Sequence, residues 1–180
     1  MPISVWSVPR FELAPLRWRL RRFAQTQVKS LLARLLKARE KCPAMMPLGE
    51  TLGFHVEQLD PGSAVVVMEA DGRHANLLGA THGGIPFVLA DTAAGLAHLG
   101  LLAEGEAGTT IEMKINFVRP VWQTKLRAEA RTVHHGRTLS LLECAVFDEE
   151  GRLVARALAT LIRLTEEAAQ GRATIYQGGV

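Results

Sequence analysis

The sequence HGGIPFVLADTAAGLAHLGLL, residues 82–102, is the most informative stretch of this 180-residue chain. From Ile85 onward, apolar side chains fall on every side of the helix that their spacing predicts. Pro86 suits the first turn of such a helix, because no partner exists there for the N–H that proline lacks. A helix that is apolar all round is buried. We therefore expect one long helix, over residues 85–102, at the centre of the domain.

Asp91 interrupts this apolar helix about two turns after its start, too far along to cap it. An ionised carboxylate among apolar side chains is costly unless it is paired or hydrogen-bonded, so Asp91 serves either a structural hydrogen bond or chemistry. Gly95 follows one turn later, where a helix would favour Ala by about 1 kcal/mol, which indicates that a backbone or a substrate approaches closely. His98 lies on the same stripe, where we expect a hydrogen-bonded core or interface histidine.

Gly83 and Gly84 immediately precede the helix. Free backbone N–H groups at a helix start, together with the positive end of the helix dipole, favour an anion or a developing oxyanion. Glycine also lets the backbone approach a ligand without a Cβ in the way. Asp91 follows Gly83 by eight residues, so the pattern predicts a site that polarises an electrophile beside a carboxylate.

Short β-type segments flank the helix on both sides. The two segments before it, residues 52–59 and 64–68, are joined by an Asp-Pro-Gly turn at residues 60–62. The four segments after it are residues 109–118, 125–133, 138–147 and 153–164. In the first of these four, Ile111, Met113, Ile115 and Phe117 alternate with polar residues, which predicts a strand with one buried face. One curved antiparallel sheet wrapped around the helix, an α+β fold, is the economical arrangement.

The basic residues concentrate at the N-terminus. Residues 1–41 hold 10 of the 21 Lys and Arg residues but only 2 of the 18 Asp and Glu residues, so this segment carries +8 and the rest of the chain −5. Leucines at three- and four-residue intervals predict a basic amphipathic helix here, packed on the body or on a second subunit. Peripheral contact of residues 10–40 with an anionic membrane is the alternative. We divide the chain into this segment, residues 1–44, the main domain, residues 45–166, and a tail, residues 167–180.

Other classes of protein fit the sequence poorly. Cys42 and Cys144 have no spacing typical of a disulfide framework or a zinc site, and arginines interrupt every apolar run of the N-terminus, unlike a secretory signal. We therefore expect a cytoplasmic protein without a metal. No nucleic-acid-binding motif accompanies the basic residues, and no serine elbow, phosphate-binding loop or dinucleotide fingerprint is present.

The segment NLLGATHGG, residues 76–84, followed by LADTAAGLA, residues 89–97, resembles the signature of the hot-dog-fold acyl-CoA thioesterases. The likeness is greatest to the PaaI-like branch, which includes 4-hydroxybenzoyl-CoA thioesterases, and it covers about residues 48–164. It implies a hot-dog fold with five to six strands around one helix. It also implies hydrolysis of an aromatic or medium-chain acyl-CoA by a homodimer or homotetramer. No cofactor is implied, because coenzyme A is part of the substrate.

By this resemblance, Asp91 is the catalytic carboxylate, acting as general base or as nucleophile, and the N–H of Gly83 polarises the thioester carbonyl. Asn76 holds the attacking water or the substrate, His82 shapes the same loop, and this loop faces Asp91 of the other subunit. Thr110 is expected near the site, although Thr109 fits after a shift of one residue. The candidates for binding the substrate and CoA are Gly84, Arg119, Gly136 and Arg137.

Two alternatives belong to the same fold. A non-catalytic acyl-CoA-binding protein is one, since some hot-dog domains act as ligand sensors. Asp91 argues against it, because a sensor needs no carboxylate beside the carbonyl. A hot-dog dehydratase is disfavoured, because the catalytic histidine and the paired acid of such enzymes are not found in this sequence.

Overall fold

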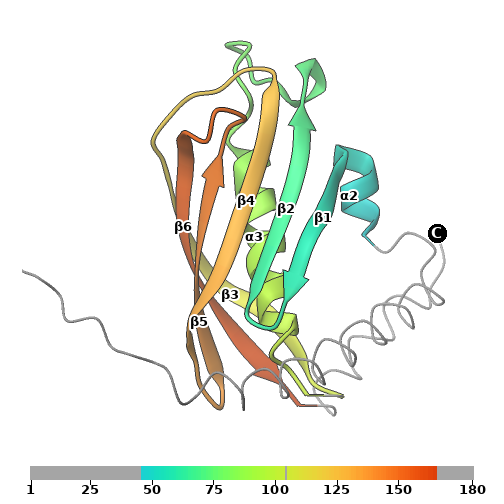
Figure 1. Ribbon diagram of the computed structural model, residues 1–180, viewed down its shortest axis with the longest axis vertical. Coiled ribbons are helices and arrows are strands. Elements are labelled where there is room, and N and C mark those ends of the chain that lie inside the picture. The colour runs from blue at the N-terminus through green and yellow to red at the C-terminus, as the bar shows by residue number, and fades with distance from the viewer. Residues whose placement is uncertain (1–45, 104, 166–180) are drawn as a thin grey trace, which may run out of the picture.

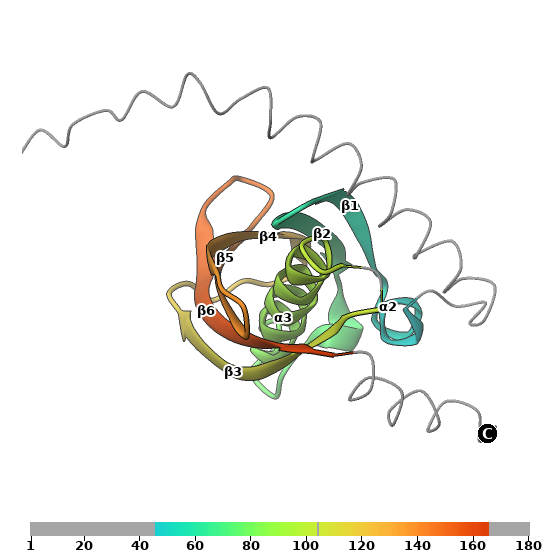
Figure 2. The ribbon, with the colours of Figure 1, turned by 90° about the horizontal axis from the view of Figure 1, so that it is seen from below.

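The computed structural model describes residues 46–103 and 105–165. Six antiparallel strands form one sheet in the spatial order β1-β2-β4-β5-β6-β3, and Figure 2 shows the sheet curving around the helix α3. The elements are α2 (Pro47–Leu52), β1 (Phe54–Asp60), β2 (Ser63–Ala70), a 3₁₀ turn (Gly72–His74), α3 (Gly84–Leu99), β3 (Ala107–Phe117), β4 (Thr124–His135), β5 (Leu139–Phe147) and β6 (Leu153–Leu164). The predicted hot-dog architecture is confirmed. The predicted basic segment and tail lie outside the described residues.

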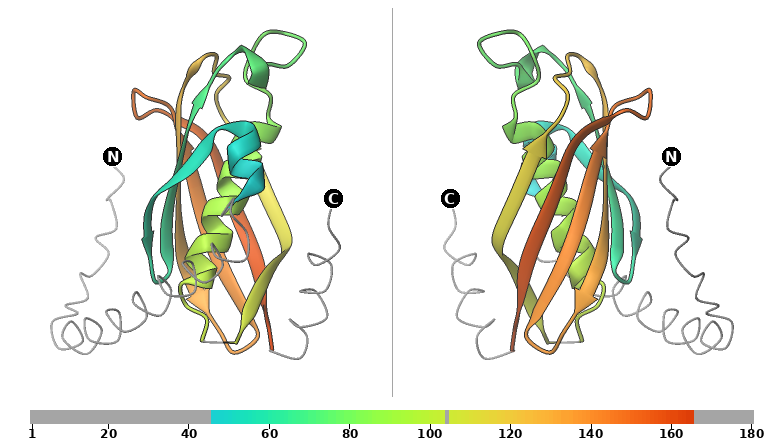
Figure 3. Two further views of the ribbon diagram at one scale, coloured as in Figure 1. Left: turned by 90° about the vertical axis from the view of Figure 1, so that its right-hand side faces the viewer. Right: turned by 90° about the vertical axis from the view of Figure 1, so that its left-hand side faces the viewer.

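Small and apolar side chains cover the face of α3 that meets the sheet. Leu89, Ala90, Ala93, Ala94 and Ala97 are each completely buried. They share one core with strand residues that include Val66, Met68, Leu126, Leu142 and Val146. Alanine at four of these five helical positions lets the helix axis lie close to the sheet, so the helix backbone is held firmly along the concave side (Figures 1 and 3).

The prediction that this helix is buried all round is wrong. Phe87 is 37% exposed, and Val88, Asp91 and Leu96 are only half-buried. The reason is geometric, because a sheet that curves around a helix covers one side of it and leaves the other side open. The helix also ends at Leu99 rather than at residue 102. Gly100 follows, and a Cβ there would lie 3.0 Å from the carbonyl oxygen of Asp60 in the turn between β1 and β2.

Strand β1 begins two residues later than predicted. Leu52 belongs to α2, a helix with Pro47 in its first turn that the sequence did not reveal to us. Gly53 ends this helix with a φ of +82°, a left-handed conformation that glycine adopts without strain. The chain thereby turns directly into β1. The predicted Asp-Pro-Gly turn then joins β1 to β2.

Strand β3 lies at one edge of the sheet and contains a β-bulge. Thr110 pairs with Leu161 and Glu112 with Thr160, so Ile111 is an extra residue without a partner on β6. The bulge reverses the alternation on its N-terminal side. Met113 and Ile115 pack against the core as predicted. Ile111 and Phe117 are 55% and 54% exposed, and their predicted burial is wrong. Thr110 takes the inward position instead.

Within residues 46–103 and 105–165, no helix combines the length and the apolar character needed to cross a membrane.

Candidate active site

Asp91 and Thr110 meet on the open side of α3. The hydroxyl of Thr110 donates a hydrogen bond of 2.8 Å to Oδ1 of the Asp91 carboxylate. Asp91 comes from the middle of the helix and Thr110 from the edge strand, and the bulge at Ile111 is what turns Thr110 toward the helix. Thr109, the other residue that fitted the sequence pattern, lines the same cavity, but it is the hydroxyl of Thr110 that bonds to Asp91. The structure therefore brings together Asp91 and Thr110, as predicted.

A cavity of about 330 Å³ opens beside this carboxylate. Its walls include Gly95, Leu96 and Leu99 of the helix and Leu161 of β6. A Cβ added to Gly95 would meet nothing within 4 Å. The missing side chain therefore enlarges the space next to Asp91 and makes no close contact with the sheet. Of the two explanations that the sequence left for this glycine, room for a substrate fits the structure.

His98 lies below the same cavity. Its ring is 1% exposed, and neither ring nitrogen has a hydrogen-bond partner among the described residues. The backbone of Ile162 is close enough to favour the charged ring but does not meet hydrogen-bond geometry. Burial, followed by repulsion from His135, lowers the pKa of His98 below its ordinary value of 6.5, which favours the neutral ring. The predicted burial is confirmed, whereas the predicted hydrogen bonding, in a core or at an interface, stays a prediction.

At the start of α3, one backbone amide is left open. The N–H of Gly84 donates to Nδ1 of His82 at 2.9 Å, and the N–H of Ile85 donates to the His82 carbonyl oxygen, also at 2.9 Å. Pro86 has no N–H. The N–H of Gly83 has no acceptor among the described residues. The Gly84 N–H is therefore used by His82, whereas the Gly83 N–H remains available at the positive end of the helix dipole.

Asn76 is held in a turn before the helix. Its side-chain Oδ1 accepts the N–H of Leu78 at 2.8 Å, and its carbonyl oxygen accepts the N–H of Gly79 at 3.0 Å. The Asn76 oxygen is thus used locally, and the amide NH₂ group is what the side chain can offer a substrate. Asn76 and His82 line one hollow of the surface.

A single copy of the chain does not bring all these groups together. Gly83 and Asp91 are eight residues apart in a helix, which separates them by about 12 Å along its axis. Asp91 and Thr110 line one cavity, Asn76 and His82 line another hollow, and Gly83 lines a third. A thioester carbonyl in contact with the Gly83 N–H of one copy is therefore out of reach of the Asp91 carboxylate of the same copy.

The remaining candidates are scattered. Arg119 lines the hollow that contains Gly83, so it stands near the predicted polarising group. Gly136 and Arg137 belong to the turn between β4 and β5, at the opposite end of the sheet (Figure 1). The N–H of Gly136 closes that turn by donating to Leu139. In one copy of the chain, Arg137 is therefore remote from Gly83.

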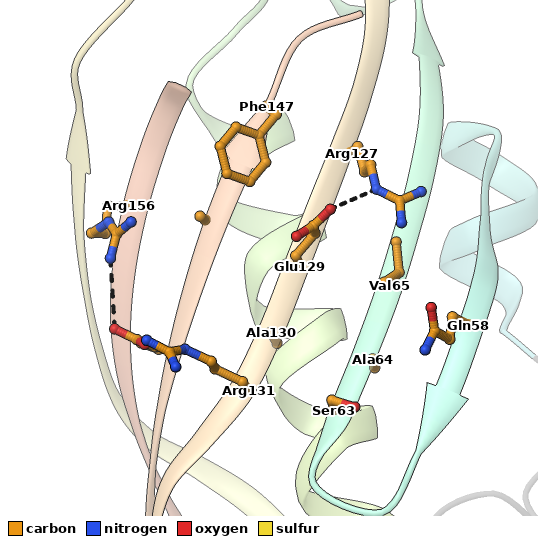
Figure 4. A pocket seen from close by; sticks show the side chains of 12 residues that line it. Gln58, Ser63, Ala64, Val65, Arg127, Glu129, Ala130, Arg131, Phe147 and Arg156 are labelled. Carbon is orange, nitrogen blue, oxygen red and sulfur yellow. Dashed lines mark hydrogen bonds and ion pairs between the residues drawn. The ribbon is translucent and has the colours of Figure 1, made fainter. Parts of the chain in front are cut away.

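The convex face of the sheet has a hollow of its own, shown in Figure 4. Arg127, Arg131 and Arg156 reach into it, but each is already paired with a glutamate. Arg127 binds Glu57 and Glu129, whereas Arg131 and Arg156 share Glu143. With their charges matched in this way, the three arginines have little capacity left for a phosphate. Nor do the described residues contain three or more His, Cys, Asp or Glu side chains grouped to hold a metal ion.

Comparison with known proteins agrees with this geometry. Residues 78–155 match the model of the thioesterase superfamily. The proofreading thioesterase EntH of Klebsiella pneumoniae is 34% identical over 101 residues, which is 56% of this chain and 74% of EntH. The chain belongs to the thioesterase superfamily. It is a hot-dog thioesterase, an enzyme that hydrolyses thioesters.

Solved structures of thioesterase relatives share the fold. The PaaI protein of E. coli, from the phenylacetic acid degradation operon, superposes with a TM-score of 0.63 at 28% identity, over 71% of this chain and 94% of that one. A hypothetical thioesterase of Streptococcus pneumoniae, solved with coenzyme A, has a TM-score of 0.58 at 28% identity over 62% and 86% of the two chains. The superfamily match spans α3 and β3, and hence Gly83, Asp91 and Thr110, but begins two residues after Asn76.

Several features of this thioesterase site escaped sequence reasoning. The walls of the cavity, Leu96, Leu99 and Leu161, have no signal that distinguishes them from core leucines. The bulge at Ile111 leaves only a faint signal in the sequence. Two threonines, Thr109 and Thr110, precede Ile111, and either of them fits the inward position of the strand. The lack of a hydrogen-bond partner for the His98 ring among the described residues depends on strands far away in the sequence.

Proposed function

We propose that this thioesterase hydrolyses an acyl-CoA, with an aromatic or medium-chain acyl group, to the free acid and CoA. The observation that carries the proposal is the Asp91 carboxylate, held by Thr110 at 2.8 Å beside a cavity of about 330 Å³. A cavity of that size holds an acyl group of moderate length. The coenzyme A in the relative from Streptococcus pneumoniae supports CoA as the thiol.

In the proposed reaction, the Gly83 N–H donates a hydrogen bond to the thioester oxygen and stabilises the negative charge that develops there. Asp91 either removes a proton from the attacking water or attacks the carbonyl carbon itself. In both cases the carbon–sulfur bond breaks, and the thiolate leaves and takes up a proton. If Asp91 attacks, the acyl–Asp91 anhydride that forms is then hydrolysed by water, which releases the acid and restores the carboxylate, so one water is consumed by either route. A thiolate is a good leaving group, so one carboxylate and one N–H can suffice without a serine triad.

We further propose that two copies of the chain share each site. The separation of about 12 Å between Gly83 and Asp91 along α3 supports this arrangement, because one thioester cannot contact both groups of one copy. Gly83, His82 and Asn76 of one copy would then face Asp91 and Thr110 of the second. The open, partly apolar side of α3, with Phe87, offers the second copy a surface to bury.

The experiment is thiol release from a panel of acyl-CoAs by the wild-type protein and by Asp91→Asn. We expect the wild-type protein to release CoA and Asp91→Asn to lose hydrolysis by a factor of about 10³ or more, since the reacting group itself is removed. Asn is nearly isosteric with Asp and still accepts the Thr110 hydrogen bond, so the thermal unfolding midpoint should stay close to that of the wild-type protein.

Full activity of an Asp91→Ala variant would refute the role given to Asp91. Tight binding of acyl-CoA by the wild-type protein over hours, with no release of thiol, would instead support the non-catalytic acyl-CoA-binding protein.

A further inference from the structure

Leu77 and Leu78 form an exposed apolar tip on the loop that leads into α3. Their side chains are 105% and 89% exposed, the highest values among the large apolar residues of the described chain. A turn usually carries polar residues at its tip, because an apolar side chain that stays in water contributes no free energy of burial. Two adjacent leucines that are this exposed therefore indicate a contact with something beyond the part of the chain that the structure describes.

The backbone beneath this tip is well ordered by hydrogen bonds. The N–H of Asn76 donates to the carbonyl oxygen of Ala80 at 2.7 Å, and the N–H of Gly79 donates back to Asn76 at 3.0 Å. Gly79 has a φ of +77°, a conformation that favours glycine. Leu78 itself is tied to the Asn76 side chain by its N–H, at 2.8 Å. Leu77 and Leu78 are therefore fixed relative to Asn76, and any contact that brings Asn76 to a second copy also brings the two leucines there.

The acyl cavity beside Asp91 has the complementary character. Leu96, Leu99 and Leu161 form the apolar part of its lining, whereas the part next to Asp91 is polar, and Gly95 adds space beside the helix. The cavity lies between α3 and the strands β3 and β6, and no other element of the described chain lines it. An apolar acyl group held there would still be partly in contact with water.

We infer that Leu77 and Leu78 of one copy close the acyl cavity of a second copy, so that these leucines select the length of the acyl group. This inference rests on the proposed shared site, in which Asn76 of one copy faces Asp91 of the other. The leucines adjacent to Asn76 then lie over the partner copy's Asp91 cavity, against the outer end of an apolar acyl chain. Longer chains reach this lid and short ones do not.

The double variant Leu77→Ala with Leu78→Ala tests the inference, because it keeps the backbone and Asn76 hydrogen bonds of the turn. Hydrolysis of acetyl-, butanoyl-, octanoyl- and phenylacetyl-CoA is measured. We expect kcat/KM to stay near the wild-type value for acetyl-CoA and to fall by about tenfold or more for octanoyl-CoA, because each buried methylene contributes to binding in the transition state. The matched control is Leu158→Ala, a leucine that is 43% exposed on the convex face of the sheet, and it should leave the panel unchanged.

Three results would overturn the inference: an unchanged panel, an equal loss for every acyl length, or dissociation to monomers that accounts for the loss. The last two would make the tip an interface contact only. Failure of the proposed function is distinguishable, since it would appear as absent hydrolysis by the wild-type protein or as full activity of Asp91→Ala.

Heterodimers purified through two different tags show which copy supplies the lid. One subunit carries Asp91→Asn and the other carries the two leucine substitutions. The surviving site then combines Asp91 of the second subunit with the intact leucines of the first. We expect this heterodimer to have wild-type chain-length selectivity. If the heterodimer instead has the altered selectivity of the double variant, the leucines act within their own copy, which would contradict the inference.

Discussion

At the scale of single residues, the Thr110 hydroxyl holds the Asp91 carboxylate in one orientation. The bond is 2.8 Å long and joins a strand to a helix, so it positions the carboxylate to which the proposed function gives the chemistry. A hydrogen bond to a charged group contributes about 1.5–3 kcal/mol. Thr109 is the same residue type one position earlier and lines the same cavity, but it makes no hydrogen bond to Asp91, so it provides a matched comparison.

We predict that Thr110→Val lowers kcat by roughly 10- to 100-fold, the equivalent of that energy, with little change in KM, because substrate binding does not need the hydroxyl. Thr109→Val should have almost no effect, and Thr110→Ser should recover most of the rate. Steady-state kinetics of the three variants provides the check. Equal losses for Thr109→Val and Thr110→Val would mean that strand packing, and not the hydroxyl, is responsible.

At the scale of elements, a glycine in α3 lowers the stability of the helix but leaves space beside Asp91. Gly95 occupies a helix interior where Ala would be more favourable, and a Cβ there meets nothing within 4 Å. We predict that Gly95→Ala raises the free energy of unfolding by about 0.5–1 kcal/mol and lowers kcat/KM for bulky acyl-CoAs, because the methyl group enters the acyl cavity. Chemical denaturation and the acyl-CoA panel measure the two effects.

Gly49 in α2 is the control for this prediction. It is also a helical glycine, but a Cβ there would lie 3.0 Å from the backbone oxygen of Phe54. Gly49→Ala should therefore destabilise the protein despite the same gain in helix propensity. Unchanged hydrolysis of bulky substrates by Gly95→Ala would show that the acyl group does not pass over this helix position.

At the scale of the whole molecule, the proposed function requires two copies to supply each site. Asp91→Asn and Asn76→Ala should each abolish or strongly reduce activity as homodimers. Mixed after unfolding and refolding, they should recover about a quarter of the wild-type rate, because half of the dimers pair unlike subunits and each of those has one intact site. Thiol release before and after mixing measures the recovery. No recovery, with mixed dimers confirmed by mass spectrometry, would place all the catalytic groups in one copy.

Local pattern is enough to predict much of this protein. The helix period around Asp91, the alternation within β3, the short β-type segments of β4 to β6 and the Gly83-Gly84 pair at a helix start are properties of neighbouring residues, and the structure confirms the elements they predict. The same pattern indicated both Thr109 and Thr110. It could not choose between them, because the choice depends on a bulge set by pairing with β6.

Local pattern does not predict which segments cover each side of a helix or strand. Which distant segments cover a residue decides three features of this protein. They are the open face of α3, the lack of a hydrogen-bond partner for the His98 ring among the described residues, and the exposure of Leu77 and Leu78. Leucine has the same chemistry in a core, in a cavity wall and on an exposed tip, so its type says nothing about its place. Burial is a property of contacts between segments far apart in the chain, and those contacts exist only once the sheet has closed around the helix.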